Sequence, residues 1–399
     1  MATRSTAVRA PRSVARTKPK AELGRGHPAV LLTVTLGVLL LLGLVMILSA
    51  SSVTSFANFG SSFMYFKKQL LWAVLGVISF VVFARLDYRR LKGVGYLLLP
   101  VVVLLLLAVL IPGVGIVAGG SARWLGAGSF AFQPSELAKI ALILFAADVF
   151  SRKEESTLED VNHTMLPMIP VLGMLALLIM LQPDMGTTML IGFIGFGMLF
   201  VAGAPLRYIL PVGALGALIA SFMAFGESYR RARLLAFMDP WADPLNTGYQ
   251  TIQSLIALGS GGWFGVGLGA SRQKWSYIPN SHTDFIFAIL GEETGLLGTL
   301  TVVGLFGFLA YLGIRIARHA PDRFGMLIAT GITILVGMQA LVNIGAVTAS
   351  LPITGVPLPF VSFGGSSLVV SLAGMGTLVN IALQSPQRSS SKGRSRKAR

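Results

Sequence analysis

The sequence contains no cysteine and only four histidines among its 399 residues. Without cysteine the chain can form neither disulfides nor thiolate metal sites, and thiolate catalysis is excluded as well. The histidines, His27, His163, His282 and His319, lie far apart in the sequence, which argues against a histidine-based zinc site. We therefore expect no haem and no thiolate-bound metal.

Charged residues are also scarce: they make up 12% of the chain, whereas 54% of the residues are hydrophobic. About 20 apolar residues are needed to cross a bilayer core, and the long apolar runs predict an all-α polytopic membrane protein. We expect about ten transmembrane helices, near residues 29–50, 70–84, 94–112, 135–150, 165–182, 186–203, 208–226, 284–313, 324–349 and 367–384. The tight connection at 182–186 leaves a re-entrant pair as an alternative for the two segments beside it.

Most of the 32 Lys and Arg residues fall in the tails and in alternate connections, and the formal net charge is +16. By the positive-inside rule, this distribution puts both termini in the cytoplasm. It predicts a basic and disordered tail at 1–28, a transmembrane domain at 29–385 and a second basic cytoplasmic tail at 386–399. The tails could also contact anionic lipid headgroups or an acidic partner, and we expect no nucleic-acid binding.

One long extracytoplasmic loop, residues 227–283, is expected between helices 7 and 8. It is predicted to form a cap on the bilayer surface with Trp241, Trp263 and Trp275 as interfacial anchors, where a lipid-linked substrate would present its headgroup. Its Gly-rich run at 259–269 lacks the Gly-Lys-Ser/Thr of a phosphate-binding loop. We therefore expect no nucleotide.

A carboxylate, Asp284, ends this loop within the sequence WSYIPNSHTDFIF at 275–287. With Ser281 or Thr283 as the helix N-cap, Asp284 would lie in the first turn of the eighth span, where the helix dipole favours its anionic form. An ionisable residue at a membrane boundary suggests a functional site, here a general base. The alternative is an acid that only stabilises the start of the helix.

A second polar cluster combines Arg123 and Trp124 with Glu136 and Lys139. Arg123 lies beside Trp124 at the outer interface, and its guanidinium is well shaped to hold a phosphate. Glu136 and Lys139 share one helical face three residues apart, so the alternative for them is a mutual salt bridge that orders the helix.

Two further acidic patches occur at Asp184 and at Glu292 and Glu293. The glutamates lie roughly 12 Å along the helix from Asp284, which favours structural pairing with polar groups on neighbouring spans. The role of Asp184 stays open between structure and function.

Residues 343–367 contain closely spaced Pro and Gly residues that cannot continue a helix. We expect an irregular segment at the outer membrane face that is buried in protein or lines a cavity.

Taken together, the chain resembles the SEDS family (shape, elongation, division and sporulation) over about residues 29–385. Five stretches carry the resemblance in the family's order, at 120–124, 133–139, 182–187, 279–287 and 343–367. The long basic amino-terminal tail and the end of the first span are more similar to the division branch, FtsW, than to the elongation branch, RodA. Phe363 stands where the family often has Tyr.

The resemblance implies a ten-span peptidoglycan glycosyltransferase that polymerises lipid II at the outer face of the cytoplasmic membrane, at the division septum. Asp284 would be the catalytic base. Undecaprenyl pyrophosphate would be the leaving group, and cationic side chains would stabilise its negative charge. The implied substrate-binding residues are Arg123, Trp124, Glu136, Lys139, Arg272, Lys274 and His282.

The same resemblance implies partners and a cofactor. The partners would be undecaprenyl-linked glycan, a class B penicillin-binding protein (a monofunctional transpeptidase) and other division proteins. A divalent cation, Mg or Mn, could share the neutralisation of the leaving group.

Three alternatives stay open at this point. A lipid II flippase would also use intramembrane charges and broken helices. A scaffold that recruits division proteins through basic tails would leave Asp284 and the long loop unused. The same polymerase could also act in cell elongation.

Overall fold

The computed structural model describes residues 27–118, 121–126, 130–153, 160–226, 237–275, 278 and 281–385. The predicted tails lie outside these residues except for 27 and 28, and so does the part of the long loop at 227–236.

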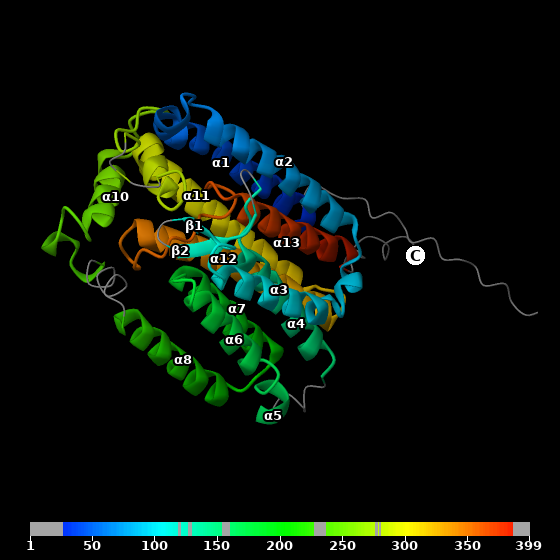
Figure 1. Cartoon of the computed structure of the whole chain (residues 1–399). Helices are drawn as coiled ribbons and strands as arrows, with labels where there is room; N and C mark the ends of the chain where they lie inside the picture. The colour runs from blue at the N-terminus through cyan, green and yellow to red at the C-terminus, as the bar shows by residue number, and fades with distance from the viewer. Residues whose placement is uncertain are drawn as a thin grey trace, which may run out of the picture.

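The described residues form a bundle of long helices that run roughly side by side (Figure 1). Ten of them match the ten predicted spans in order: α1 (Pro28–Phe59), α2 (Met64–Arg85), α3 (Val94–Leu110), α4 (Pro134–Ser151), α6 (Ile169–Met180), α7 (Met185–Ala202), α8 (Leu206–Gly226), α11 (Ile286–Arg318), α12 (Arg323–Val347) and α13 (Gly365–Gln384). The prediction of an all-α polytopic membrane protein is confirmed.

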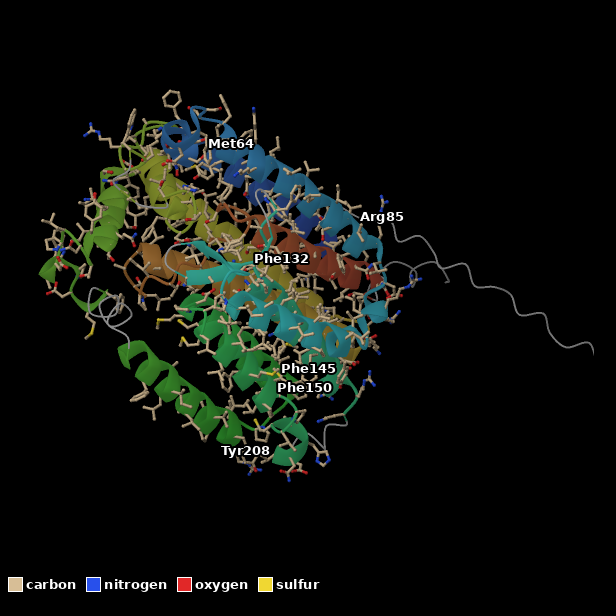
Figure 2. All side chains as sticks on the ribbon, in the orientation of Figure 1. Met64, Arg85, Phe132, Phe145, Phe150 and Tyr208 are labelled. Carbon is tan, nitrogen blue, oxygen red and sulfur yellow. The ribbon has the colours of Figure 1, made fainter. Side chains whose placement is uncertain are left out.

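Seven helical segments of the described chain are long and apolar enough to cross a membrane, and α3 and the apolar part of α8 are shorter. Residues 161–180 and α7 both belong to the seven, so length and composition favour two separate spans in this region. Figure 2 labels Met64 and Arg85 at opposite ends of α2, one at each end of the bundle.

Smaller elements lie at the ends of the bundle. They are η1 (Tyr88–Leu91), the antiparallel strands β1 (Ile116–Ala118) and β2 (Ser121–Trp124), α5 (Val161–Thr164), η3 (Pro240–Ala242) and α10 (Tyr249–Ser260). The short hairpin of β1 and β2 was not predicted from the sequence.

Helix α13 lies inside the bundle and packs closely on α2. A Cβ atom added to Gly376 would come within 2.4 Å of the carbonyl oxygen of Phe80, so only glycine lets the two backbones approach this closely. Small residues serve such contacts in membrane bundles because lipid provides no hydrophobic force between helices.

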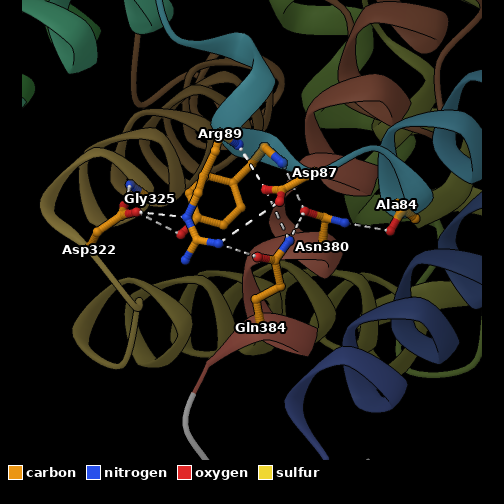
Figure 3. A network of polar contacts seen from close by, with 8 residues as sticks. Ala84, Asp87, Arg89, Asp322, Gly325, Asn380 and Gln384 are labelled. Carbon is orange, nitrogen blue, oxygen red and sulfur yellow. Dashed lines mark hydrogen bonds and ion pairs between the residues drawn. The ribbon is translucent and has the colours of Figure 1, made fainter. Parts of the chain in front are cut away.

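Just beyond the C-terminal end of α2, a polar network joins the connection between α2 and α3 to α12 and α13 (Figure 3). Asp322 caps α12 through the N–H of Gly325 at 2.7 Å and accepts hydrogen bonds from Tyr88 and Arg89. Burial pushes the pKa of Asp322 up, but these donors outweigh it and hold that pKa below its usual value. Burial, followed by the nearby Asp322 carboxylate, raises the pKa of Tyr88 to about 12.

The described part of the long loop is a folded cap that is attached to α11. Gly295 has a φ of 68° and a ψ of −166°, which breaks the hydrogen-bond ladder of α11. The Gly-rich loop takes over the released groups: Leu296 N–H donates to Gly262 at 2.9 Å, and Val266 N–H donates to Glu292 at 2.9 Å, both to backbone carbonyls. The backbone groups released by this break are thus satisfied within the protein.

Candidate functional site

Asp284 lies in a turn that directly precedes α11 and is half-buried. The residue at the N-cap position is Phe285, which makes no capping hydrogen bond through its side chain. The expectations of Ser281 or Thr283 as the N-cap, and of Asp284 in the first helical turn, were therefore wrong. Contacts with distant parts of the chain set the path of this turn in place of local capping.

Asn343 of α12 is the main anchor of the turn. Its Nδ2 donates to the carbonyl of Asp284 at 2.9 Å and to the carbonyl of Val356 at 2.8 Å. The Asp284 side chain faces Gly355, since its Oδ2 lies 3.6 Å from the position that a Cβ on Gly355 would take. One amide thus holds the acid and the segment opposite it in a fixed relation.

That segment, residues 352–364, is irregular and mostly buried. It is shorter than the predicted stretch at 343–367, because 343–347 continue α12 and 365–367 begin α13. Gln339, one helical turn before Asn343, donates from Nε2 to the carbonyl of Pro357 at 3.0 Å. On the α2 side, Gln69 donates to Ser362 O at 3.4 Å and accepts from the N–H of Gly364 at 3.3 Å. Amides from two helices therefore position the segment.

Helix α7 meets the same segment with its first turn. Asp184 caps α7 through the N–H of Thr187 at 3.0 Å, and its Oδ2 accepts from Gln133 at 3.0 Å. A Cβ added to Gly186 would lie 2.4 Å from Val356, so the helix and the segment are in direct contact. These contacts give Asp184 a structural role.

Arg123 extends from β2 onto the turn that joins α6 and α7. Its Nε donates to the carbonyl of Gln182 at 3.0 Å, and its Nη2 donates to the carbonyl of Pro183. Trp124, the next residue, is partly exposed at the end of the strand. The structure thus gives Arg123 a partner that its sequence neighbourhood does not reveal, and brings it to the turn that precedes Gly186.

Glu136 and Lys139 form a salt bridge on α4, with 2.8 Å between Nζ and Oε2. The two residues are only 3% and 1% exposed. Nζ of Lys139 also donates to Oε1 of Gln339 at 3.0 Å, the amide that holds Pro357. The pair therefore lies beneath the segment at 352–364 and contacts it through Gln339.

Arg272 and Lys274 belong to the loop that Glu292 and Glu293 hold. Oε1 of Glu292 accepts from the N–H of Arg272 at 3.1 Å, and its other oxygen accepts from the hydroxyl of Ser271. Glu293 accepts from the hydroxyl of Ser49 at 2.6 Å. Lys274 is buried and donates to the carbonyl of Gly269, whereas Arg272 is exposed. The glutamates thus pair with polar groups of α1 and of the loop, as expected.

His282 packs in an aromatic cluster two residues before Asp284. Its ring centroid lies 4.6 Å from that of Tyr65 and 5.6 Å from that of Phe363, and its carbonyl accepts from the N–H of Phe363 at 3.0 Å. The residue is 7% exposed, its Nδ1 has no hydrogen-bond partner, and burial lowers its pKa to about 4. The imidazole is therefore neutral near pH 7.

The sequence reasoning missed Gln69 and Gln339, and it included Asn343 only as the first residue of the stretch at 343–367, although all three hold the site together. The signal that could have found them is a side-chain amide within an apolar span, because such a group must find hydrogen-bond partners inside the bundle. Within the described part of the chain, no three His, Asp or Glu residues come together to hold a metal ion. Dependence on a divalent cation therefore stays a prediction.

Residues 29–387 match the family model described as cell cycle protein, for FtsW, RodA and SpoVE. Stage V sporulation protein E of Bacillus subtilis is 42% identical over 356 residues, which cover 89% of this chain and 97% of that protein. A probable peptidoglycan glycosyltransferase FtsW of Geobacter metallireducens is 42% identical over 340 residues, or 85% of this chain and 90% of that protein.

Two solved structures are similar as well. A chain from a peptidoglycan synthase complex that coordinates polymerization and crosslinking matches with a TM-score of 0.72 at 31% identity, covering 88% of this chain and 96% of that one. RodA of Thermus thermophilus matches with a TM-score of 0.65 at 28% identity, covering 89% and 97%.

Proposed function

Because the chain belongs to the cell cycle protein family of FtsW, RodA and SpoVE, we propose that it is a peptidoglycan glycosyltransferase that polymerises lipid II. The reaction takes place at the outer face of the cytoplasmic membrane. The observation that carries the site assignment is the geometry around Asp284, a half-buried carboxylate whose backbone is fixed by Asn343 opposite the segment at 352–364.

Asp284 acts as the general base. It takes the proton from the 4-hydroxyl of the acceptor's N-acetylglucosamine, and that oxygen attacks the anomeric carbon of the donor chain. The bond from the anomeric carbon to the pyrophosphate breaks, and undecaprenyl pyrophosphate leaves with the bonding electrons. Its partly buried carboxylate lies two residues before the start of α11 and is the group placed to accept this proton.

Cations stabilise the pyrophosphate as its charge develops. Arg123, which lies at the turn between α6 and α7 with Trp124 beside it, supplies one of these cations. Arg272 and Lys274 supply two more from the outer loop. His282 contacts substrate from the aromatic cluster. Glu136 and Lys139 act through Gln339, as positioning residues for the segment at 352–364. A Mg or Mn ion would take its ligands mainly from the pyrophosphate oxygens.

The cellular setting follows from the relatives. A transpeptidase of the class B penicillin-binding proteins is the expected partner, since the similar solved chain comes from a complex that both polymerises and crosslinks. We assign the chain to cell division and to the septum, because several relatives are named FtsW. Elongation is the alternative role for the same enzyme.

The test is lipid II polymerisation by purified protein in detergent, with the cognate transpeptidase and a divalent ion present. Wild type is expected to form glycan polymer on a gel, and Asp284→Asn to form none while it stays folded, because the amide keeps the shape but cannot accept the proton. Polymer from Asp284→Asn at the wild-type rate would remove Asp284 as the base. Absence of polymer from wild type, together with lipid II movement across liposomes, would establish a flippase instead.

A further inference from the structure

The outer ends of α1 and α2 carry an exposed patch of aromatic and basic side chains that the proposed reaction does not use. It consists of Phe59, Phe63, Tyr65, Lys67 and Lys68, and we call it the outer ledge. Phe59 is 47% exposed and Phe63 is 53% exposed. Contiguous exposed apolar patches mark binding surfaces more often than single exposed side chains do.

The outer ledge stands above the apolar part of the membrane. Helix α1 has 32 residues and is therefore about 48 Å long, whereas a bilayer core is about 30 Å thick. Its apolar run ends near residue 48, and the sequence SASSVTSFAN follows to residue 58. The end of α1 that carries Phe59 therefore lies beyond the apolar run of this helix.

The outer ledge is continuous with the candidate active site. The ring of Tyr65 lies 4.6 Å from the ring of His282 and 5.5 Å from that of Phe363, and Phe59 packs edge-on against Tyr65 at 5.5 Å. His282 precedes Asp284 by two residues, and its buried Nδ1 has no hydrogen-bond partner. The rings of His282, Tyr65 and Phe59 thus form one series of contacts from the turn of Asp284 to the outer ledge.

The connection between α1 and α2, next to the outer ledge, is held by side-chain hydrogen bonds. The hydroxyl of Ser55 donates to the carbonyl of Ser61 at 2.6 Å and accepts from the N–H of Met64 at 3.1 Å. Gly60 closes α1 with a φ of 68°. A surface fixed in this way loses little conformational freedom when it binds a ligand.

The outer ledge is also positively charged. Lys68 Nζ lies 5.5 Å from the centre of the Phe59 ring, and Lys67 is exposed beside it. Within the described residues neither lysine forms an ion pair, and residues 51–86 contain no acidic residue. The charge is thus available to an anionic ligand.

From these observations we propose that the outer ledge is a binding site for the glycan strand itself, an amino-sugar polymer that carries carboxylates on its peptide side chains. The aromatic rings contact the apolar faces of the sugars, and the two lysines pair with the carboxylates. This inference rests on the proposed polymerase function. The outer ledge would keep the growing strand bound to the enzyme between successive additions.

Strand binding can be measured apart from catalysis. Uncrosslinked glycan strands made enzymatically from lipid II are titrated against the full-length Asp284→Asn protein in detergent, which cannot extend them. In that background, Phe59→Ala and the double variant Lys67→Gln/Lys68→Gln should each weaken strand binding about fivefold. Lys67→Arg/Lys68→Arg should retain it, and Phe222→Ala, an exposed aromatic on α8, is the matched control.

In the active protein the same variants should shorten the strands, which are sized on a gel. Unchanged strand binding together with unchanged strand length would overturn the proposal, and so would loss of co-purification with the transpeptidase while strand binding stays intact. If wild type forms no polymer, the proposed function fails, and the titration still decides whether the outer ledge binds strands.

Discussion

Replacing Lys139 by methionine should destabilise the protein strongly. The change removes the cation 2.8 Å from Glu136 and leaves that carboxylate buried at 3% exposure. Solvent screening is small at such a site, and breaking a buried ion pair on one side costs about 3–5 kcal/mol. We expect a loss of this size in the free energy of unfolding.

The double variant Glu136→Gln/Lys139→Met should recover most of that stability. It removes both charges and keeps side chains of similar volume, and such replacements of a buried pair are often neutral. The double variant is therefore expected within about 1 kcal/mol of wild type. The comparison separates the cost of an uncompensated charge from any direct role of Lys139 in the reaction.

Polymerisation should not recover to the same extent. In the double variant Gln339 loses the donor that orients its amide, and its hold on the carbonyl of Pro357 loosens. The loss of one hydrogen bond from a charged group is worth roughly 1.4 kcal/mol, or about tenfold in rate. We expect a rate about one tenth that of wild type.

Thermal unfolding in detergent, followed by tryptophan fluorescence, reports stability, and a lipid II polymerisation gel reports activity. A single variant with the melting temperature of wild type would show that Glu136 does not depend on Lys139. A double variant that polymerises at the wild-type rate would refute the positioning role.

Other substitutions test separate parts of the site and the fold. Asn343→Ala removes the amide that donates to the carbonyls of Asp284 and Val356. The free energy of unfolding should fall by about 2–4 kcal/mol, and the polymerisation rate should fall by about a hundredfold. A gel with near-normal polymer would contradict the anchoring role. Arg123→Ala should lower polymerisation while membrane levels stay normal by immunoblot, and unchanged polymerisation would leave it only a structural role at its turn. The pKa of Asp322 is lower in the folded state than its ordinary value of 3.8, so the carboxylate stabilises the protein fully above that value and loses this effect as the pH falls through the folded-state pKa. The difference in melting temperature between wild type and Asp322→Asn should therefore become smaller below about pH 4. A difference that does not change with pH would refute this linkage. Gly295→Ala should lower the melting temperature, because its φ of 68° is strained for alanine and a Cβ would lie 2.4 Å from the backbone of the Gly-rich loop; an unchanged melting temperature would show that the break in α11 tolerates a side chain.

The membrane topology could be predicted from the sequence because each span is a local property. About 20 consecutive apolar residues satisfy the bilayer only as a helix, so hydrophobic runs located all ten helices without knowledge of their neighbours. The irregular segment at 352–364 could be predicted for the same reason, since its Pro and Gly residues interrupt a helix locally, whatever their neighbours in space. The ends of the helices were less accurate: α1 runs to Phe59, nine residues beyond the predicted 50.

The composition of the site was visible in the sequence, but its connections were decided by the tertiary structure. Asp284 was recognisable as an acid at a membrane boundary. The turn that contains it, however, is held by a hydrogen bond from Asn343, 59 residues away, and not by a local helix cap. Lys139 reaches Gln339 across 200 residues, and Ser49 reaches Glu293 across 244. A buried polar group takes whichever partner the packed helices bring near, because leaving it unpaired costs more than any local preference supplies.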